Sequence, residues 1–120
     1  MARIVLAEDD RATRDLVKRA LEQDGHEVFV TQDGQEALEH FGTAKQRPDI
    51  LVSDVHMPGL DGFSLARRAI EAVPTLSILL MSGFPEELER AKGINAQRVG
   101  VLSKPFSLEQ IRAAVRQLIA

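Results

Sequence analysis

The stretch LVSDVHMPGLDGF, residues 51–63, joins an apolar run to an abrupt break in the chain. Its first residues are typical of a strand whose two faces are both buried. Two turn-forming pairs follow, Pro58-Gly59 and Asp61-Gly62. Asp54 therefore lies at the end of a buried strand, where an unpaired carboxylate costs free energy unless something compensates for its charge.

Four more apolar runs occur along the chain, with longer segments of helical periodicity between them. All five runs are apolar at successive residues, which is typical of a parallel sheet that is covered on both faces. Right-handed crossovers between parallel strands place helices on both faces of such a sheet. The pattern predicts a doubly wound α/β fold in a single domain, residues 1–120, with strands at 4–7, 28–30, 50–52, 78–81 and 99–102.

Four of the intervening segments carry an apolar helical face. Asp33 with Glu36, and Ser107 with Gln110, have the spacing of a capping box, and Gly25 lies where a glycine typically ends a helix. The predicted faces are Leu16, Val17, Ala20 and Leu21; Ala37, Leu38 and Phe41; Leu65, Ala66, Ala69 and Ile70; and Leu108, Ile111, Val115 and Leu118.

The segment 84–98 differs from the other four. Only Leu88 and Ala91 offer a buried face there, so a fourth helix is expected to be short or irregular. His26 and His40 have no companions at metal-ligand spacing, and both are expected at the surface.

Composition excludes several classes of protein. A hydrophobic share of 44% in 120 residues is ordinary for a globular domain, and the absence of cysteine excludes disulfides and thiolate metal sites. Apolar runs of about five residues are too short to span a membrane. The N-terminus has no room for a signal peptide, so a cytoplasmic location is expected. A net charge of −3 gives no electrostatic reason to expect a nucleic acid as partner.

Polar side chains follow the first, third, fourth and fifth predicted strands. Because ligands in a doubly wound fold bind beyond the carboxyl ends of the strands, we expect these side chains to converge. Several carboxylates in one cleft repel one another unless a cation such as a hard divalent metal neutralises them. Together with a hydroxyl and a lysine, they suit a phosphoryl group, with Asp54 as nucleophile. The residues are Glu8, Asp9, Asp10, Asp54, Ser82 and Lys104.

Each of these residues also has an ordinary structural interpretation. Asp9-Asp10 is suited to capping the first helix, and an aspartate such as Asp54 is common ahead of a Pro-Gly turn. Lys104 taken alone is typical of a solvated side chain, and Ser82-Gly83 of a simple turn. The functional interpretation rests on all four groups falling at strand ends on the same side of the sheet.

The ordered set of motifs resembles the receiver domain of CheY-like response regulators over residues 3–119. The motifs are Asp9-Asp10, the D-x-x-M-P-G-x-D-G run that begins at Asp54, Ser82-Gly83 and Lys104-Pro105. The resemblance implies a flavodoxin-like sheet of strand order 2-1-3-4-5 and a phosphoacceptor switch in a two-component phosphorelay. It implies a histidine kinase or histidine phosphotransferase as donor, a downstream protein partner, and a monomer or weak homodimer that binds neither nucleic acid nor membrane.

The resemblance also implies roles for individual residues. Asp54 accepts the phosphoryl group, Lys104 pairs with a phosphoryl oxygen, and Ser82 donates to that group once the switch has turned. Catalysis is expected to be limited to the domain's own phosphorylation and dephosphorylation. The implied Mg²⁺ ligands are Asp10, Asp54, the main-chain carbonyl of His56, and Asp9 through water.

Three further expectations follow from the same resemblance. The Lys104–Pro105 peptide bond is expected to be cis. His56 and Phe84 are expected to set the lifetime of the phosphorylated state, since each lies two residues past a site group. Val101 stands where the family commonly has an aromatic ring, so the signal is expected to travel through residues 83–95 instead.

Two other interpretations concern the wider role of the chain. The segments RIVLAEDD, MSGF and VLSKPF are similar to stand-alone receivers of the CpdR type, which act as phosphorylation-controlled adaptors for a protease, and to receivers of hybrid kinases. With an end at Ala120, no output domain is expected. A phosphatase of the haloacid dehalogenase type is the alternative of another class; it requires a second aspartate where this chain has His56.

Overall fold

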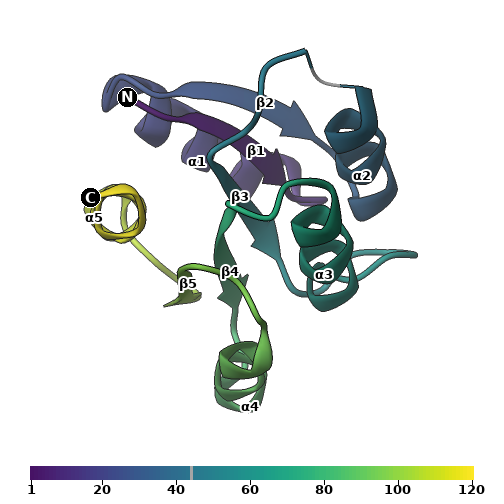
Figure 1. Cartoon of the computed structure of the whole chain (residues 1–120). Coiled ribbons are helices and arrows are strands. Elements are labelled where there is room, and N and C mark those ends of the chain that lie inside the picture. Colours follow the sequence, from purple (N-terminus) through teal and green to yellow (C-terminus); the bar gives the residue numbers. More distant parts are fainter. Residues whose placement is uncertain (44) are drawn as a thin grey trace.

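A five-stranded parallel sheet forms the centre of the molecule (Figure 1). The structure is a computed structural model that describes residues 1–43 and 45–120. The strands lie in the order β2-β1-β3-β4-β5, which confirms the predicted doubly wound topology. Their bounds are β1 Arg3–Ala7, β2 Glu27–Thr31, β3 Ile50–Asp54, β4 Ser77–Ser82 and β5 Val99–Ser103.

Helices cover both faces of the sheet, as Figure 1 shows. Helices α1 and α5 pack on one face, and α2, α3 and the segment that follows α4 pack on the other. The bounds are α1 Arg11–Gln23, α2 Gly34–Thr43, α3 Gly62–Ala72, α4 Pro85–Arg90, the short 3₁₀ helix η1 Ala91–Gly93, and α5 Leu108–Ile119. No helix within the described ranges is both long and apolar enough to cross a bilayer.

The continuous apolar runs have a simple explanation in the three central strands. Successive side chains of a strand point to opposite faces, so Leu51 packs beneath α2 and α3 while Ile50 and Val52 pack beneath α1 and α5. The edge strands differ, since β2 exposes Phe29 and β5 exposes Val101. The prediction of strands buried on both faces therefore holds for β1, β3 and β4, because an edge strand has only one neighbouring strand and less helix above it.

The predicted helix ends are present in the structure. The Ser107 side chain accepts a hydrogen bond from Gln110 N–H at 3.1 Å and the Gln110 side chain bonds back, which forms a complete capping box. Gly25 follows α1 with a φ of 87°, a left-handed conformation that glycine adopts without strain. Leu16 differs from its prediction: it is 40% exposed, because it lies at the margin of the stripe that buries Val17.

The fourth helix is short, as predicted. It has six residues and continues into the three residues of η1. None of the six residues is fully buried, and the first fully buried side chain after Ser82 is that of Ala91. Tertiary packing of an apolar face supplies most of the stability of a helix, so α4 is held less firmly than the other helices.

His26 is buried, in contrast to the surface position expected for it. Its Nδ1 accepts a hydrogen bond from the Ala2 N–H at 3.0 Å, and its Nε2 lies 4.0 Å from the Asp24 carboxylate. Burial lowers the pKa of His26, because a protonated imidazole loses hydration inside the protein. An accepting Nδ1 and a lowered pKa both indicate a neutral ring in the folded state.

We expect the contribution of His26 to the free energy of unfolding to decrease between about pH 7.5 and about pH 5.5, so that over this range the wild type loses more stability, or gains less, than the His26→Gln variant. The unfolded chain binds a proton at His26 near its ordinary pKa of about 6.5, whereas the folded state does not, so stability is lost as the pH falls through that value. Urea denaturation at both pH values measures the difference, which reaches at most about 1.4 kcal/mol per pH unit. Parallel pH profiles for the two proteins would contradict the prediction.

Candidate functional site

Asp54 is the last residue of the central strand β3, and it is only 7% exposed. In the register between β1 and β3, Ala7 lies opposite Ser53, so Glu8 lies at the level of Asp54. On the other side of β3, Ser82 ends β4. The carboxyl ends of three neighbouring strands thus bring two carboxylates and a hydroxyl to one edge of the sheet, as expected for a doubly wound fold.

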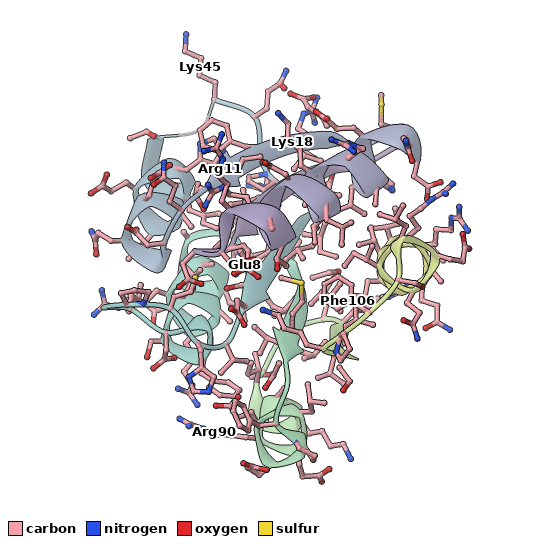
Figure 2. All side chains as sticks on the ribbon, turned by 180° about the vertical axis from the view of Figure 1, so that it is seen from behind. Glu8, Arg11, Lys18, Lys45, Arg90 and Phe106 are labelled. Atoms are coloured by element: carbon pink, nitrogen blue, oxygen red, sulfur yellow. The ribbon has the colours of Figure 1, made fainter. Side chains whose placement is uncertain are left out.

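Three carboxylates come together at this edge. Glu8, Asp9 and Asp54 each offer an oxygen, and these oxygens lie within 4.8 Å of one another. Glu8 is fully buried, and Figure 2 shows it close to α1, near the middle of the molecule. The pKa of Glu8 is raised to about 7, mainly by burial and also by the nearby charge of Asp54, which together outweigh the hydrogen bonds that Glu8 accepts from the Asp10 N–H and Lys104. An all-oxygen set of this kind fits a hard divalent cation such as Mg²⁺.

Lys104 provides the positive charge of the site. It follows β5, and its Nζ lies 3.1 Å from a carboxylate oxygen of Asp54 and 3.1 Å from one of Glu8. Burial by itself lowers the pKa of Lys104, but the hydrogen bonds and charges of Asp54 and Glu8 outweigh burial and raise it. Lys104 is therefore a fixed positive charge beside Asp54. The Lys104–Pro105 bond is cis, which confirms that expectation.

Asp10 lies outside the carboxylate cluster, in contrast to its expected place among the metal ligands. Its side chain is the N-cap of α1 and accepts hydrogen bonds from the Thr13 N–H at 2.9 Å and the Thr13 hydroxyl at 2.7 Å. These bonds lower the pKa of Asp10. In this structure the Asp10 carboxylate thus serves as a helix cap, and the carboxylates that come together at the strand ends are those of Glu8, Asp9 and Asp54.

The turn after Asp54 depends on a glycine. A Cβ at Gly62 would lie 2.9 Å from Val55 Cα and would also collide with the backbone oxygen of Asp54. Glycine at this position therefore lets the start of α3 pack directly against the end of β3. Asp61 caps the same helix by accepting a hydrogen bond from the Ser64 N–H at 2.9 Å. The Asp61-Gly62 pair thus holds the loop beside the Asp54 carboxylate.

Ser82 is buried, and its hydroxyl is engaged by the loop and helix that follow it. The Ser82 Oγ donates a hydrogen bond to Glu87 Oε1 at 2.5 Å and accepts one from the Phe84 N–H at 3.0 Å. The hydroxyl is thus at the expected edge of the sheet, but its proton points to α4.

His56 also contacts Glu87 rather than the carboxylate cluster. Its Nε2 lies 2.5 Å from Glu87 Oε2, its side chain is 65% exposed, and its ring meets Phe84 edge-on at 5.3 Å. An exposed imidazole in this position does not replace the second aspartate that a haloacid dehalogenase-type phosphatase requires.

Comparison with known proteins identifies the family. The family model described as the response regulator receiver domain matches residues 4–116. The chain belongs to this family. The receiver domain is 40% identical over 117 residues to response regulator MprA of Mycobacterium leprae, a match that covers 98% of this chain and 50% of that protein. The chain thus spans about half the length of the curated relatives that it matches.

Solved structures agree with this assignment. Chemotaxis protein CheY4 of Vibrio cholerae is 30% identical with a TM-score of 0.86, and the match covers 98% of both chains. Response regulator TrrA of Thermotoga maritima, solved in complex with Mg²⁺ and BeF, is 25% identical with a TM-score of 0.81, and the match covers 98% of this chain and 99% of that one. A receiver domain is a phosphoacceptor switch of two-component signalling, which is the predicted function. Neither comparison supports a phosphatase or a protease adaptor.

Two residues of this receiver domain differ from what the sequence predicts. Glu8 is expected among the converging carboxylates but not among the metal ligands, although its place directly after β1 is the signal that puts it level with Asp54. Glu87 was not singled out, because one glutamate in a short polar helix carries no recognisable pattern. Only its contacts with Ser82 and His56 reveal it.

Proposed function

We propose that Asp54 accepts a phosphoryl group from a phosphohistidine of a histidine kinase or phosphotransferase. The observation that carries the proposal is the ion pair between Asp54 and Lys104 at the edge of the carboxylate cluster, with 3.1 Å between the charged atoms. Receiver domains take phosphoryl groups from histidine kinases, which supports this class of donor.

The transfer needs alignment and charge neutralisation more than covalent chemistry from the protein. An Asp54 carboxylate oxygen attacks phosphorus, the phosphorus–nitrogen bond of the phosphohistidine breaks, and its electron pair stays on the imidazole nitrogen. Lys104 neutralises charge on a phosphoryl oxygen as the group arrives. In dephosphorylation, a water oxygen attacks phosphorus and the bond to Asp54 breaks, which restores the carboxylate and releases phosphate.

We propose that Glu8, Asp9 and Asp54 hold Mg²⁺, together with the main-chain oxygen of His56. The close approach of the three carboxylates and the burial of Glu8 support this set of ligands. The helix cap formed by Asp10 argues against a set that includes Asp10. When bound, Mg²⁺ supplies neutralisation of the negative charge that accumulates as an anionic phosphoryl group meets a carboxylate.

The direct test is the mass of the protein after incubation with acetyl phosphate and Mg²⁺. Wild-type protein is expected to gain one phosphoryl group, and peptide mapping is expected to locate it on Asp54. Omission of Mg²⁺ is expected to suppress the gain. Modification at another aspartate, or none under conditions where the protein is folded, would overturn the proposed function.

Replacing both His56 and Phe84 with alanine is expected to change the decay rate of phosphorylated Asp54 several-fold. Both side chains are exposed and they pack edge-to-face, with 5.3 Å between their ring centroids. Because each lies two residues past a site group, we expect the pair to flank the path of an attacking water. Loss of label from phosphorylated protein after removal of the phosphodonor measures this rate. The extent of phosphorylation serves as the control, because neither side chain is needed to accept the group. An unchanged decay rate would remove both from the mechanism.

A further inference from the structure

Glu87 connects two parts of the site that the phosphotransfer chemistry leaves unexplained. One carboxylate oxygen accepts the hydrogen bond from the Ser82 hydroxyl, and the other lies 2.5 Å from His56 Nε2. These partners come from the end of β4 and from the loop after β3, whereas Glu87 belongs to α4. With a side chain only 18% exposed, Glu87 connects residues beside the phosphorylation site to its own helix α4, which has no fully buried residue.

We propose that Glu87 is a latch, a positioning residue that holds the Ser82 hydroxyl away from Asp54 and keeps α4 in its unphosphorylated position. The inference rests on the proposed function of Asp54. A serine hydroxyl has one hydrogen to donate, so Ser82 can donate it to Glu87 or to a phosphoryl oxygen, but not to both. Phosphorylation of Asp54 thus offers Ser82 a new acceptor in direct competition with Glu87.

Charge favours release once the phosphoryl group is present. Phosphorylated Asp54 carries more negative charge than the unmodified carboxylate, and Glu87 is a second anion, hydrogen-bonded to Ser82 at the end of the neighbouring strand β4. Like charges at short range repel, so the arrangement that suits an unmodified Asp54 becomes unfavourable. When Ser82 turns to the phosphoryl group, Glu87 loses its buried partner and keeps only the contact with the exposed His56.

The helix that carries Glu87 is suited to respond. Ala91 and Ile94 are buried and attach this segment to the core, whereas Leu88 is only half-buried. Arg90, labelled beside α4 in Figure 2, lies over the Phe63 ring at 4.3 Å. Segments with few buried apolar contacts open at low cost in free energy. Val101 is exposed on the adjacent strand β5 and has no ring to turn inward, so the latch gives residues 83–95 a direct connection to the site.

The test uses the affinity for beryllofluoride with Mg²⁺, which mimics the phosphoryl group on Asp54. Glu87→Ala is expected to bind beryllofluoride about tenfold more tightly than wild type, a factor that one charge-assisted hydrogen bond supports. Glu86→Ala is the matched control: Glu86 also lies in the first turn of α4 but is exposed, so its removal makes the same change in charge and helix propensity. Glu87→Gln, which keeps the shape of the side chain, is expected to give a smaller gain and serves if the alanine variant does not fold.

The same comparison in a Ser82→Ala background separates a latch from a general effect of charge. Without the hydroxyl there is no hydrogen bond to release, so the gain from Glu87→Ala is expected to be clearly smaller there, whereas simple removal of a negative charge would raise affinity equally in both backgrounds. Without beryllofluoride, hydrogen exchange in residues 83–95 is expected to be faster in Glu87→Ala than in the wild type. Beryllofluoride is expected to produce the same increase in the wild type.

The outcomes are distinct. Wild type that fails to bind beryllofluoride would overturn the proposed function and the latch with it. Wild type that binds, with equal affinities for the Glu87→Ala and Glu86→Ala variants, would overturn the latch alone. A gain of equal size in the Ser82→Ala background would also overturn it, since Glu87 would then act without Ser82. Exchange changes confined to α1 or α2 would show that residues 83–95 do not carry the response.

Discussion

Asp54→Asn is expected to abolish phosphorylation by acetyl phosphate while the domain stays folded. An amide has nearly the shape of the carboxylate but is not a nucleophile, and its neutrality relieves repulsion with Glu8 and Asp9. Lys104 loses one partner but keeps Glu8 at 3.1 Å, so its charge is not left unpaired. Intact mass after incubation with acetyl phosphate and Mg²⁺ measures the loss, and thermal unfolding checks the fold.

Asp61→Asn provides a matched control for this experiment. It makes the same chemical change in the same loop, and asparagine also caps helices well, so α3 is expected to keep its start and phosphorylation is expected to persist. Mg²⁺ is expected to raise the free energy of unfolding of wild type more than that of Asp54→Asn. Phosphorylation of the Asp54→Asn variant would place the acceptor elsewhere, and an equal stabilisation by Mg²⁺ would mean that Asp54 is not a ligand.

The second large effect concerns the metal set. Glu8→Gln and Asp9→Asn are each expected to weaken Mg²⁺ binding by at least about tenfold, because each removes a charged oxygen from a site that depends on charge. Asp10→Asn is expected to leave the affinity close to that of wild type, since Asp10 caps α1 and asparagine preserves that cap. Calorimetric titration of each variant with Mg²⁺ measures the affinities. If Asp10→Asn lost as much affinity for Mg²⁺ as Asp9→Asn, Asp10 would be a metal ligand and the set proposed here would be wrong.

The pH dependence of Mg²⁺ binding adds a check on Glu8. The pKa of Glu8 is raised to about 7, mainly by burial, so Glu8 is protonated in a fraction of the molecules at neutral pH. That proton must leave when a cation binds. Affinity is therefore expected to decrease as the pH falls through 7, and Glu8→Gln is expected to show a weaker pH dependence. Identical pH profiles would mean that Glu8 does not bind the metal.

The order of elements follows from the sequence alone, because it depends on local patterns. Five continuous apolar runs specify buried parallel strands, and the Ser107–Gln110 capping box specifies where α5 begins. The shortness of α4 follows from the scarcity of apolar residues in its segment. The place of Asp54 and Lys104 at strand ends is also a local property, since a parallel sheet gathers all its carboxyl ends at one edge.

Tertiary structure decided which side chains meet at that edge. Glu8 and Asp10 are both acids beside Asp9, and only the register of β1 against β3 and the start of α1 determine that Glu8 joins the cluster while Asp10 caps the helix. The burial of His26 and the contacts of Glu87 likewise depend on residues distant in the chain. A sequence pattern specifies the face and the end of each element, whereas hydrogen-bond partners and burial arise only when separate elements pack together.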